Sequence, residues 1–168
     1  MAFADLIVSN DTARIFSVHL KSFGFGEREY RAIDEVKTES DYDVRESKNI
    51  LRKMRNTFRW HGLQSDFIYK MTRSSPYPYI LTGDLNDVPT SYAYETIKGE
   101  LQDAFIEKGS GLGATFISAT SSLLRILPTL RIDYIFADTN FKTTQFLKGG
   151  KRISDHLFIM ADFNLRTK

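Results

Sequence analysis

Candidate catalytic groups stand at three places where a polar cluster adjoins a strand-like run. The first is Gly83-Asp84-Leu85-Asn86-Asp87, in which Asp84 and Asn86 lie two residues apart. In an extended segment these two side chains project from one face. A carboxylate beside an amide suits a site where a water is deprotonated and a phosphoryl oxygen is held. The alternative is an ordinary strand-to-loop turn, for which glycine, aspartate and asparagine are the usual residues.

The second cluster is Ser154-Asp155-His156, directly before the strand-like residues 157–159. Asp155 offers a hard oxygen ligand for magnesium. His156 beside it is able to donate to a phosphate or to act as a base near neutral pH. The alternative is a capped turn with His156 in an ordinary hydrogen bond.

The third candidate is Asp133, which stands inside the strand-forming run 131–135. A carboxylate is costly to bury without a partner, and an imidazole is a natural one, because the carboxylate fixes its tautomer. The alternatives are an edge-strand aspartate facing water and an ion pair with Arg131. His19, at the end of its own strand, is a weaker candidate of the same kind.

The strands expected around these clusters are short and rich in apolar and β-branched residues. They are predicted at 4–8, 13–20, 77–81, 131–137 and 157–163. Turn residues at 9–11 predict a hairpin between the first two of them.

Helices are expected between the second and third of these strands. Apolar residues recur at helical spacing on both sides of Gly62, with arginine and lysine on the other face; they are Leu51, Met54, Phe58, Leu63, Phe67 and Met71. We expect a helical pair divided at Gly62, and a shorter helix at 91–97. Strands around a central helical pair predict a layered α/β domain with a mixed sheet.

Composition narrows the function classes. The chain has 168 residues, enough for one domain, and its 42% hydrophobic and 26% charged residues exclude collagen-like, disordered and coiled-coil proteins. A net charge of +2 does not indicate a strong nucleic-acid binder. The absence of cysteine excludes disulfides, thiolate zinc sites and cysteine nucleophiles. No apolar run is long enough for a membrane helix and no signal peptide opens the chain, so we expect it to be soluble as given.

Taken together and in their order along the chain, the polar clusters resemble the endonuclease/exonuclease/phosphatase superfamily. Its fold is that of pancreatic deoxyribonuclease, apurinic endonucleases, neutral sphingomyelinases and inositol polyphosphate phosphatases. The matching segments are Val18-His19-Leu20, Gly83-Asp84-Leu85-Asn86, Arg131-Ile132-Asp133-Tyr134-Ile135 and Ser154-Asp155-His156. The resemblance runs from about Asp5 to Asn164. It implies a single domain over 1–168 with the layered α/β/β/α sandwich of mixed sheets and flanking helices.

The resemblance also implies a reaction, divalent-metal-dependent hydrolysis of a phosphoester by in-line attack of water. Asp84 would orient or deprotonate that water, and Asn86 would hold it or a phosphoryl oxygen. Asp155 would lie near the metal, Mg²⁺ or Mn²⁺, directly or through water.

The same resemblance assigns the imidazoles to the phosphate. His156, paired with Asp133, would contact the scissile phosphate, and His19 would be a second imidazole on it. The cation and the imidazoles would offset the charge of the pentacoordinate state.

One departure from the family bears on activity. Its members begin with a strand bearing an Asn and continue to a strand bearing a metal-binding Glu, whereas only 18 residues precede His19 here. The chain therefore resembles the C-terminal portion of the domain. Missing strands would leave few oxygen ligands for magnesium and would expose apolar surface, so we expect weak catalysis and self-association. The alternative is a non-catalytic binding module that keeps the fold without a complete metal site.

The resemblance leaves the substrate class open among nucleic acid, phospholipid head group and inositol phosphate. Bacterial members of similar appearance carry membrane segments upstream, which places membrane attachment of a parent protein among the expectations, and no obligate protein partner is implied. Residues 122–131 combine leucine with arginine, as a cleft rim, a membrane contact or a core-filling loop would. Residues 148–152 are basic, as phosphate-steering groups or an exposed turn would be.

Overall fold

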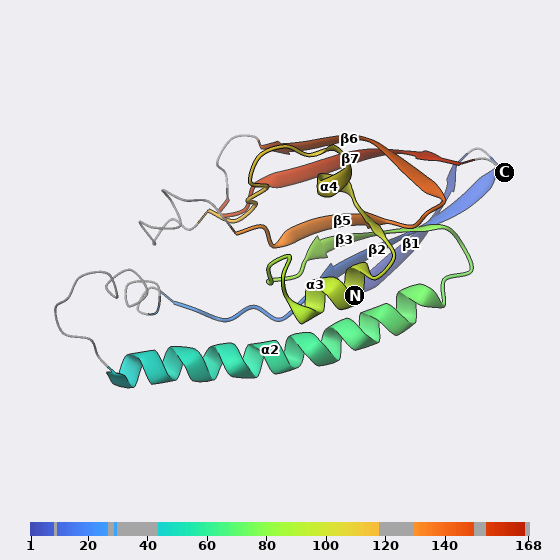
Figure 1. Ribbon diagram of the computed structural model, residues 1–168. Helices are drawn as coiled ribbons and strands as arrows, with labels where there is room; N and C mark the ends of the chain where they lie inside the picture. The colour runs from blue at the N-terminus through green and yellow to red at the C-terminus, as the bar shows by residue number, and fades with distance from the viewer. Residues whose placement is uncertain (9, 27–28, 30–43, 118–129, 150–153, 167–168) are drawn as a thin grey trace.

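The computed structural model describes residues 1–8, 10–26, 29, 44–117, 130–149 and 154–166 (Figure 1). It contains a five-stranded sheet, a two-stranded sheet and helices. The strands are β1 (Ala2–Val8), β2 (Asp11–His19), β3 (Tyr79–Asp84), β4 (Gln102–Asp103), β5 (Asp133–Ala137), β6 (Phe141–Gly149) and β7 (Phe158–Leu165). The helices are α2 (Val44–Arg73), α3 (Tyr92–Lys98) and α4 (Ala104–Lys108).

The larger sheet has the strand order β1-β2-β3-β5-β4 and is mixed, because β2 and β3 are parallel and its other pairs are antiparallel. Its register aligns three of the candidate site residues. His19 pairs with Asp84 across β2 and β3, and Asp84 pairs with Asp133 across β3 and β5. These residues therefore form a row at one end of the sheet.

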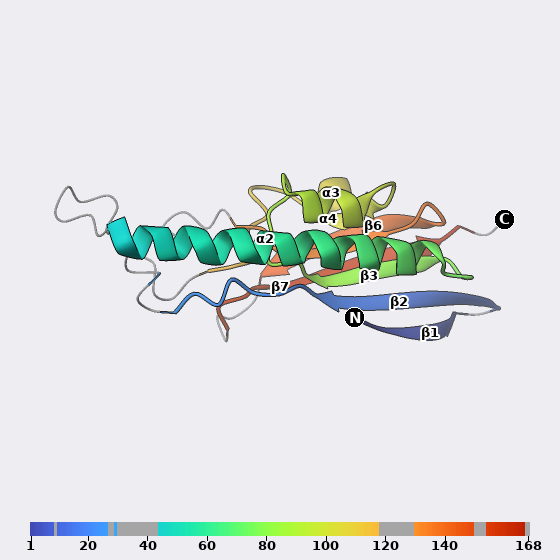
Figure 2. The same cartoon turned by 90° about the horizontal axis from the view of Figure 1, so that it is seen from below.

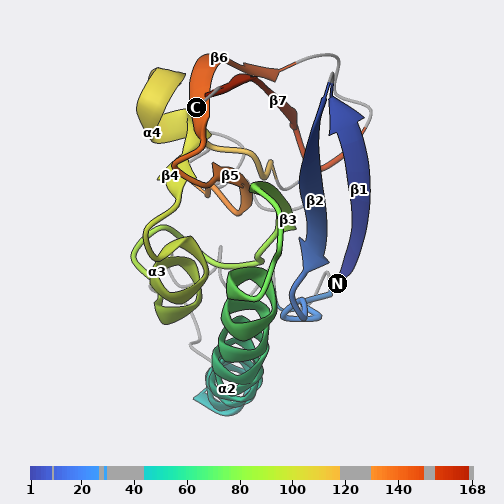
Figure 3. The ribbon, with the colours of Figure 1, turned by 90° about the vertical axis from the view of Figure 1, so that its right-hand side faces the viewer.

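The layers follow the order expected for a mixed α/β sandwich. Helices α2 and α3 cover one face of the larger sheet, and the β6-β7 hairpin covers part of the other face, with α4 beside β6 (Figures 1 and 3). The main core lies between the sheet and the helices and includes the fully buried Phe16, Leu81, Leu85, Ile97 and Phe136. The predicted fold class is thus confirmed, whereas the strand β6 was not predicted.

Helix α2 corrects the expectation of a helical pair. It is one continuous helix of 30 residues that passes through Gly62 without interruption. A glycine inside a helix costs only about 1 kcal/mol relative to alanine, and tertiary contacts such as those of the neighbouring His61 and of the buried Ile68 offset that cost. Figure 2 shows α2 running lengthwise, with β1 and β2 on one side and α3 on the other.

The buried face of α2 differs from the one indicated by its apolar residues. Leu51, Phe58, Leu63 and Phe67 are all exposed, with 45 to 64% of each residue accessible. The face turned toward the protein carries the polar residues Thr57, His61, Ser65 and Thr72 together with the apolar Ile68. Ser65 and Thr72 satisfy their hydroxyls on carbonyls of the same helix, which allows them to be buried.

Apolar side chains are also exposed on the outer strands. On β1, Phe3 is 53% and Ile7 82% accessible, and on β7, Phe158 is 58% accessible. Of the helices in the described residues, none has the length and apolarity needed to cross a membrane. Residues 122–129 of the segment that combines leucine with arginine, and residues 150–152 of the basic segment, lie outside the described residues.

Candidate active site

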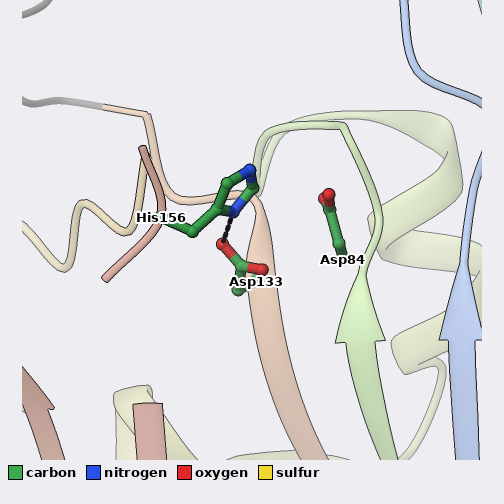
Figure 4. A group of neighbouring side chains, drawn as sticks. All are labelled: Asp84, Asp133 and His156. Atoms are coloured by element: carbon green, nitrogen blue, oxygen red, sulfur yellow. Dashed lines mark hydrogen bonds and ion pairs between the residues drawn. The ribbon is translucent and has the colours of Figure 1, made fainter. Parts of the chain in front are cut away.

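Three candidate side chains converge at the end of the larger sheet. Asp84, Asp133 and His156 each present a ligand atom, and these atoms all lie within 4.8 Å of one another (Figure 4). Asp84 ends β3, Asp133 begins β5, and His156 precedes β7. Segments far apart in the sequence thus bring two carboxylates and an imidazole together.

The position of Asp84 depends on the close approach of β3 to β2. A Cβ at Gly83 would lie 1.9 Å from the carbonyl oxygen of Val18, so a side chain cannot be accommodated there. Glycine is the residue that permits such an approach. It allows the ends of the two parallel strands, with His19 and Asp84, to lie side by side.

The turn after β3 fixes Asn86 against Asp84. Asn86 has a left-handed backbone with φ of 48°, and its N–H donates to Oδ1 of Asp84 at 2.7 Å. Its side-chain Nδ2 donates to Oδ2 of Asp84 and to the carbonyl of Leu20, each at 3.1 Å. Asparagine tolerates this conformation better than most residues. The turn that the alternative interpretation required is therefore present, and it orients both polar side chains.

Asp133 and His156 form a hydrogen-bonded pair, with 2.9 Å between Oδ2 and Nδ1. The hydroxyl of Thr115 accepts from the backbone N–H groups of Ile132 and Asp133, each at 3.1 Å, and so fixes the start of β5. Phe116 forms a β-bridge with His156 and packs its ring against the imidazole, with centroids 5.2 Å apart. The expected pairing of aspartate and imidazole is observed, whereas Arg131 instead bonds to Asp103 at 2.6 Å.

The electrostatics of the cluster favour binding of positive charge. Burial raises the pKa of Asp84, and the nearby Asp133 carboxylate raises it further, although the Asn86 N–H opposes this. Burial lowers the pKa of His156, but the hydrogen bond to Asp133 and the negative charges of Asp133, Asp84 and Asp155 together outweigh it and leave the pKa raised. A protonated His156 would therefore persist to higher pH than a free imidazole.

His19 and Asp155 lie at the margin of the cluster. Nε2 of His19 is 3.6 Å from Oδ2 of Asp84, and its side chain is 71% exposed. Asp155 is exposed and accepts a hydrogen bond from Ser154 Oγ at 3.1 Å. It does not belong to the group of three within 4.8 Å. Its assignment to the metal stays a prediction, as do the catalytic roles of the other residues.

The donor set fits a divalent cation. Magnesium and manganese take carboxylate oxygens, and magnesium keeps several waters when one or two carboxylates bind it. Asp84 and Asp133 supply such oxygens within one small group. The raised pKa of Asp84 reflects a carboxylate that a cation would stabilise in its charged form.

Three further residues form hydrogen bonds within or beside the segments that carry the site, and sequence reasoning did not identify them. Thr115 orients Asp133, as described above. The buried His61 and Asp87 bond to each other through Nδ1 and Oδ2 at 2.8 Å. The buried polar face of α2 gives no hydropathy signal that would predict this pair. The residue types were a possible signal, because a histidine within the helix and an aspartate at the end of the Gly83–Asp87 cluster are able to form such a pair.

Comparison with known proteins identifies the family. Residues 53–156, more than half of the chain, match the model of the Endonuclease/Exonuclease/phosphatase family. No curated protein matches the chain at a significant level.

Solved structures of the same fold are markedly longer than this chain. One is a variant of the 3′ phosphatase NExo from Neisseria, bound to a product DNA hairpin (TM-score 0.58, 14% identity, 95% of this chain and 63% of that one). Another is the human Nocturnin catalytic domain with bound sulfate (TM-score 0.55, 18% identity, 94% and 48%). A third is the mannosyl-6-phosphatase Bt3783 from Bacteroides thetaiotaomicron (TM-score 0.51, 18% identity, 94% and 53%). The chain spans about half to two thirds of these relatives.

Proposed function

Because this chain belongs to the endonuclease/exonuclease/phosphatase family, we propose that it carries a phosphoester-hydrolysing site that depends on a divalent metal. The observation that carries the proposal is the convergence of Asp84, Asp133 and His156 within 4.8 Å at the end of the sheet. A hydrolase needs a base for water, a donor for the phosphate and a charge to offset the transition state. This group contains side chains suited to each of these tasks.

Asp84 is proposed to orient and deprotonate the attacking water. Asn86 holds the water through its side-chain oxygen, since both N–H groups of Nδ2 are engaged by Asp84 and by the Leu20 carbonyl. The two hydrogen bonds from Asn86 to Asp84 keep the carboxylate in one orientation.

His156 is proposed to donate to the scissile phosphate through Nε2. Its Nδ1 is engaged by Asp133, and none of the described residues bonds to Nε2. The raised pKa of His156 favours the imidazolium, which stabilises negative charge on the phosphate. His19, largely exposed beside Asp84, supplies a second imidazole to the same phosphate.

The metal is proposed to be Mg²⁺ or Mn²⁺, which acts as a Lewis acid on a phosphoryl oxygen. Asp84 and Asp133 are suited to hold it, and Asp155 adds an exposed oxygen ligand nearby. We further propose that N-terminal strands bearing an Asn and a Glu complete the domain in the whole protein, as the greater length of the structural relatives suggests.

The proposed substrate is a phosphoester, with nucleic acid, phospholipid head group and inositol phosphate all retained as classes. The names of the structural relatives mention a DNA hairpin product and a mannosyl-6-phosphatase activity, which supports phosphate chemistry without choosing a substrate. Attachment of the parent protein to a membrane stays a prediction.

A direct test measures hydrolysis of bis(p-nitrophenyl) phosphate with Mg²⁺, with Mn²⁺ and with chelator, beside Asp84→Asn and Asp155→Asn. Chelator-sensitive turnover that both variants lose would support the proposed residues. Turnover that appears only after upstream residues are added would support the C-terminal-portion proposal. Absence of turnover from both forms would favour a binding module that keeps the fold.

A further inference from the structure

His61 and Asp87 make the most deeply buried ion pair between an imidazole and a carboxylate among the described residues. Their side chains are 2% and 5% exposed, and 2.8 Å separates His61 Nδ1 from Asp87 Oδ2. The other ring nitrogen, Nε2, lies 2.7 Å from the carbonyl oxygen of Lys21. Since a carbonyl only accepts, Nε2 carries a proton, and the second proton of the pair is shared between Nδ1 and the carboxylate.

These contacts join three segments that are distant in sequence. His61 belongs to α2, Lys21 follows β2 by two residues, and Asp87 lies three residues after Asp84. The segment after β2 and the segment after β3 also meet at the site, since Asn86 Nδ2 donates to the Leu20 carbonyl at 3.1 Å. The Leu20 carbonyl thus accepts from Asn86, and the next carbonyl, that of Lys21, accepts from His61.

Asp87 forms further hydrogen bonds through its side chain and its backbone carbonyl. Its Oδ1 accepts from the N–H of Val88 at 3.0 Å, and its carbonyl accepts from the hydroxyl of Tyr134 at 2.8 Å. Neither His61 nor Asp87 belongs to the group of Asp84, Asp133 and His156 that faces the site. The pair lies outside that group, so its contribution to the proposed reaction would pass through the residues it holds.

We propose that His61 and Asp87 are a positioning pair, which holds the segment bearing Asp84 and Asn86 against the segment that follows His19. The inference rests on the proposed function for its effect on turnover. Its structural content, that the pair sets the geometry of residues 84–87 and 20–21, stands apart from that function. Displacement of catalytic groups by about 1 Å can lower turnover on the order of 100-fold.

The test separates positioning from stability by removing both partners at once. In the double variant His61→Phe/Asp87→Leu, no buried charge is left unpaired, and replacing a buried ion pair by apolar residues is often neutral for stability. The phenyl ring also keeps the packing that His61 makes with Phe23 and Phe58. We expect a folded protein with kcat lowered about tenfold to 100-fold and with KM little changed.

Two further variants provide matched controls. Ser65→Ala removes another buried polar group from the same face of α2, one whose hydroxyl bonds only within the helix, and should leave kcat unchanged. Asp87→Asn keeps both hydrogen bonds with a neutral His61, since the Asn amide donates to Nδ1, and should keep most of the activity. A double variant that folds and retains kcat within about twofold, against the loss of tenfold or more expected on removal of such partners, would overturn the proposal.

If the wild type shows no turnover, kcat cannot test the positioning role. Amide NMR spectra of the double variant then test it instead. Backbone ¹H–¹⁵N signals of residues 20–21 and 84–87 should shift or exchange faster in the double variant and not in Ser65→Ala. Unchanged signals would overturn the positioning role, whereas an inactive wild type would count against the proposed function alone. If the double variant fails to fold, the same signals are compared in Asp87→Asn, where they should stay close to wild type, and in His61→Gln, where they should move.

Discussion

The protein contains two aspartate–histidine pairs that are alike in contact and opposite in setting. In both, Nδ1 of the histidine meets Oδ2 of the aspartate, at 2.9 Å for His156 and Asp133 and at 2.8 Å for His61 and Asp87. The first pair is partly open, with side chains 31% and 19% exposed, whereas the second is 2% and 5% exposed.

The second ring nitrogen decides what each pair is able to do. Nε2 of His61 is taken by the Lys21 carbonyl, whereas Nε2 of His156 has no partner among the described residues and remains available to a ligand. One chemical unit can thus serve as a brace when both nitrogens are occupied and as a phosphate donor when one is free. Exposure and the partner of Nε2, not residue type, distinguish the two proposed roles.

The largest difference between the pairs should appear in stability. Replacing His61 by leucine leaves the Asp87 carboxylate buried without its partner, which costs about 3 to 5 kcal/mol. The same change at His156 should cost less than about 1 kcal/mol, because solvent screens the pair and hydrates the remaining carboxylate. Urea unfolding of both variants checks this, and equal losses would remove the contrast in burial.

Turnover should reverse the ranking. We expect His156→Gln to lower kcat about 100- to 1000-fold, the effect of removing a donor to a developing negative charge, with an unchanged melting temperature. Phosphodiester hydrolysis with saturating Mg²⁺ measures it. Retained turnover in this variant would take the phosphate role from His156, and a loss of stability as large as that expected for His61→Leu would make His156 structural.

Amide replacements at the two aspartates should separate them further. Asp133→Asn removes the carboxylate that favours a charged His156 and should lower kcat about tenfold to 100-fold, as loss of an orienting partner does. Asp87→Asn should have little effect on kcat, since the hydrogen bonds of His61 can be kept. Equal losses from the two changes would contradict the difference in role.

The smallest expected effect is a pH dependence of stability. Burial lowers the pKa of His61, but the hydrogen bonds to Asp87 and to the Lys21 carbonyl, together with the charges of Asp87 and Asp84, outweigh it and leave the pKa raised. A raised folded-state pKa gives stability that is complete below the unfolded value of about 6.5 and is lost as pH rises through the folded value. Unfolding free energies should therefore fall over this window in wild type and fall less in Asp87→Asn. Parallel curves would exclude a charged His61.

The residues of the candidate site could be predicted from the sequence, whereas the buried pair of His61 and Asp87 could not. Asp84, Asp133 and His156 adjoin strand-like runs, so their types and positions pointed to one another before any coordinates. The face of α2 was misjudged because hydropathy favours burying Phe58 and Leu63, while Thr57, His61 and Ser65 are the residues that are buried. Burial of those groups depends on partners such as Asp87, which are distant in sequence and leave no periodic signal.

The contact between β2 and β3 at Gly83 also restricts how this sequence can vary. A Cβ there would lie 1.9 Å from the Val18 carbonyl oxygen and 2.8 Å from its carbonyl carbon, and backbone atoms cannot rotate aside as a side chain would. In a library of all twenty residues at position 83, we expect glycine alone among the folded clones. The distance between the two strands thus sets which residues position 83 can accept. The functional consequence lies at the next residue, because this close approach places the carboxylate of Asp84.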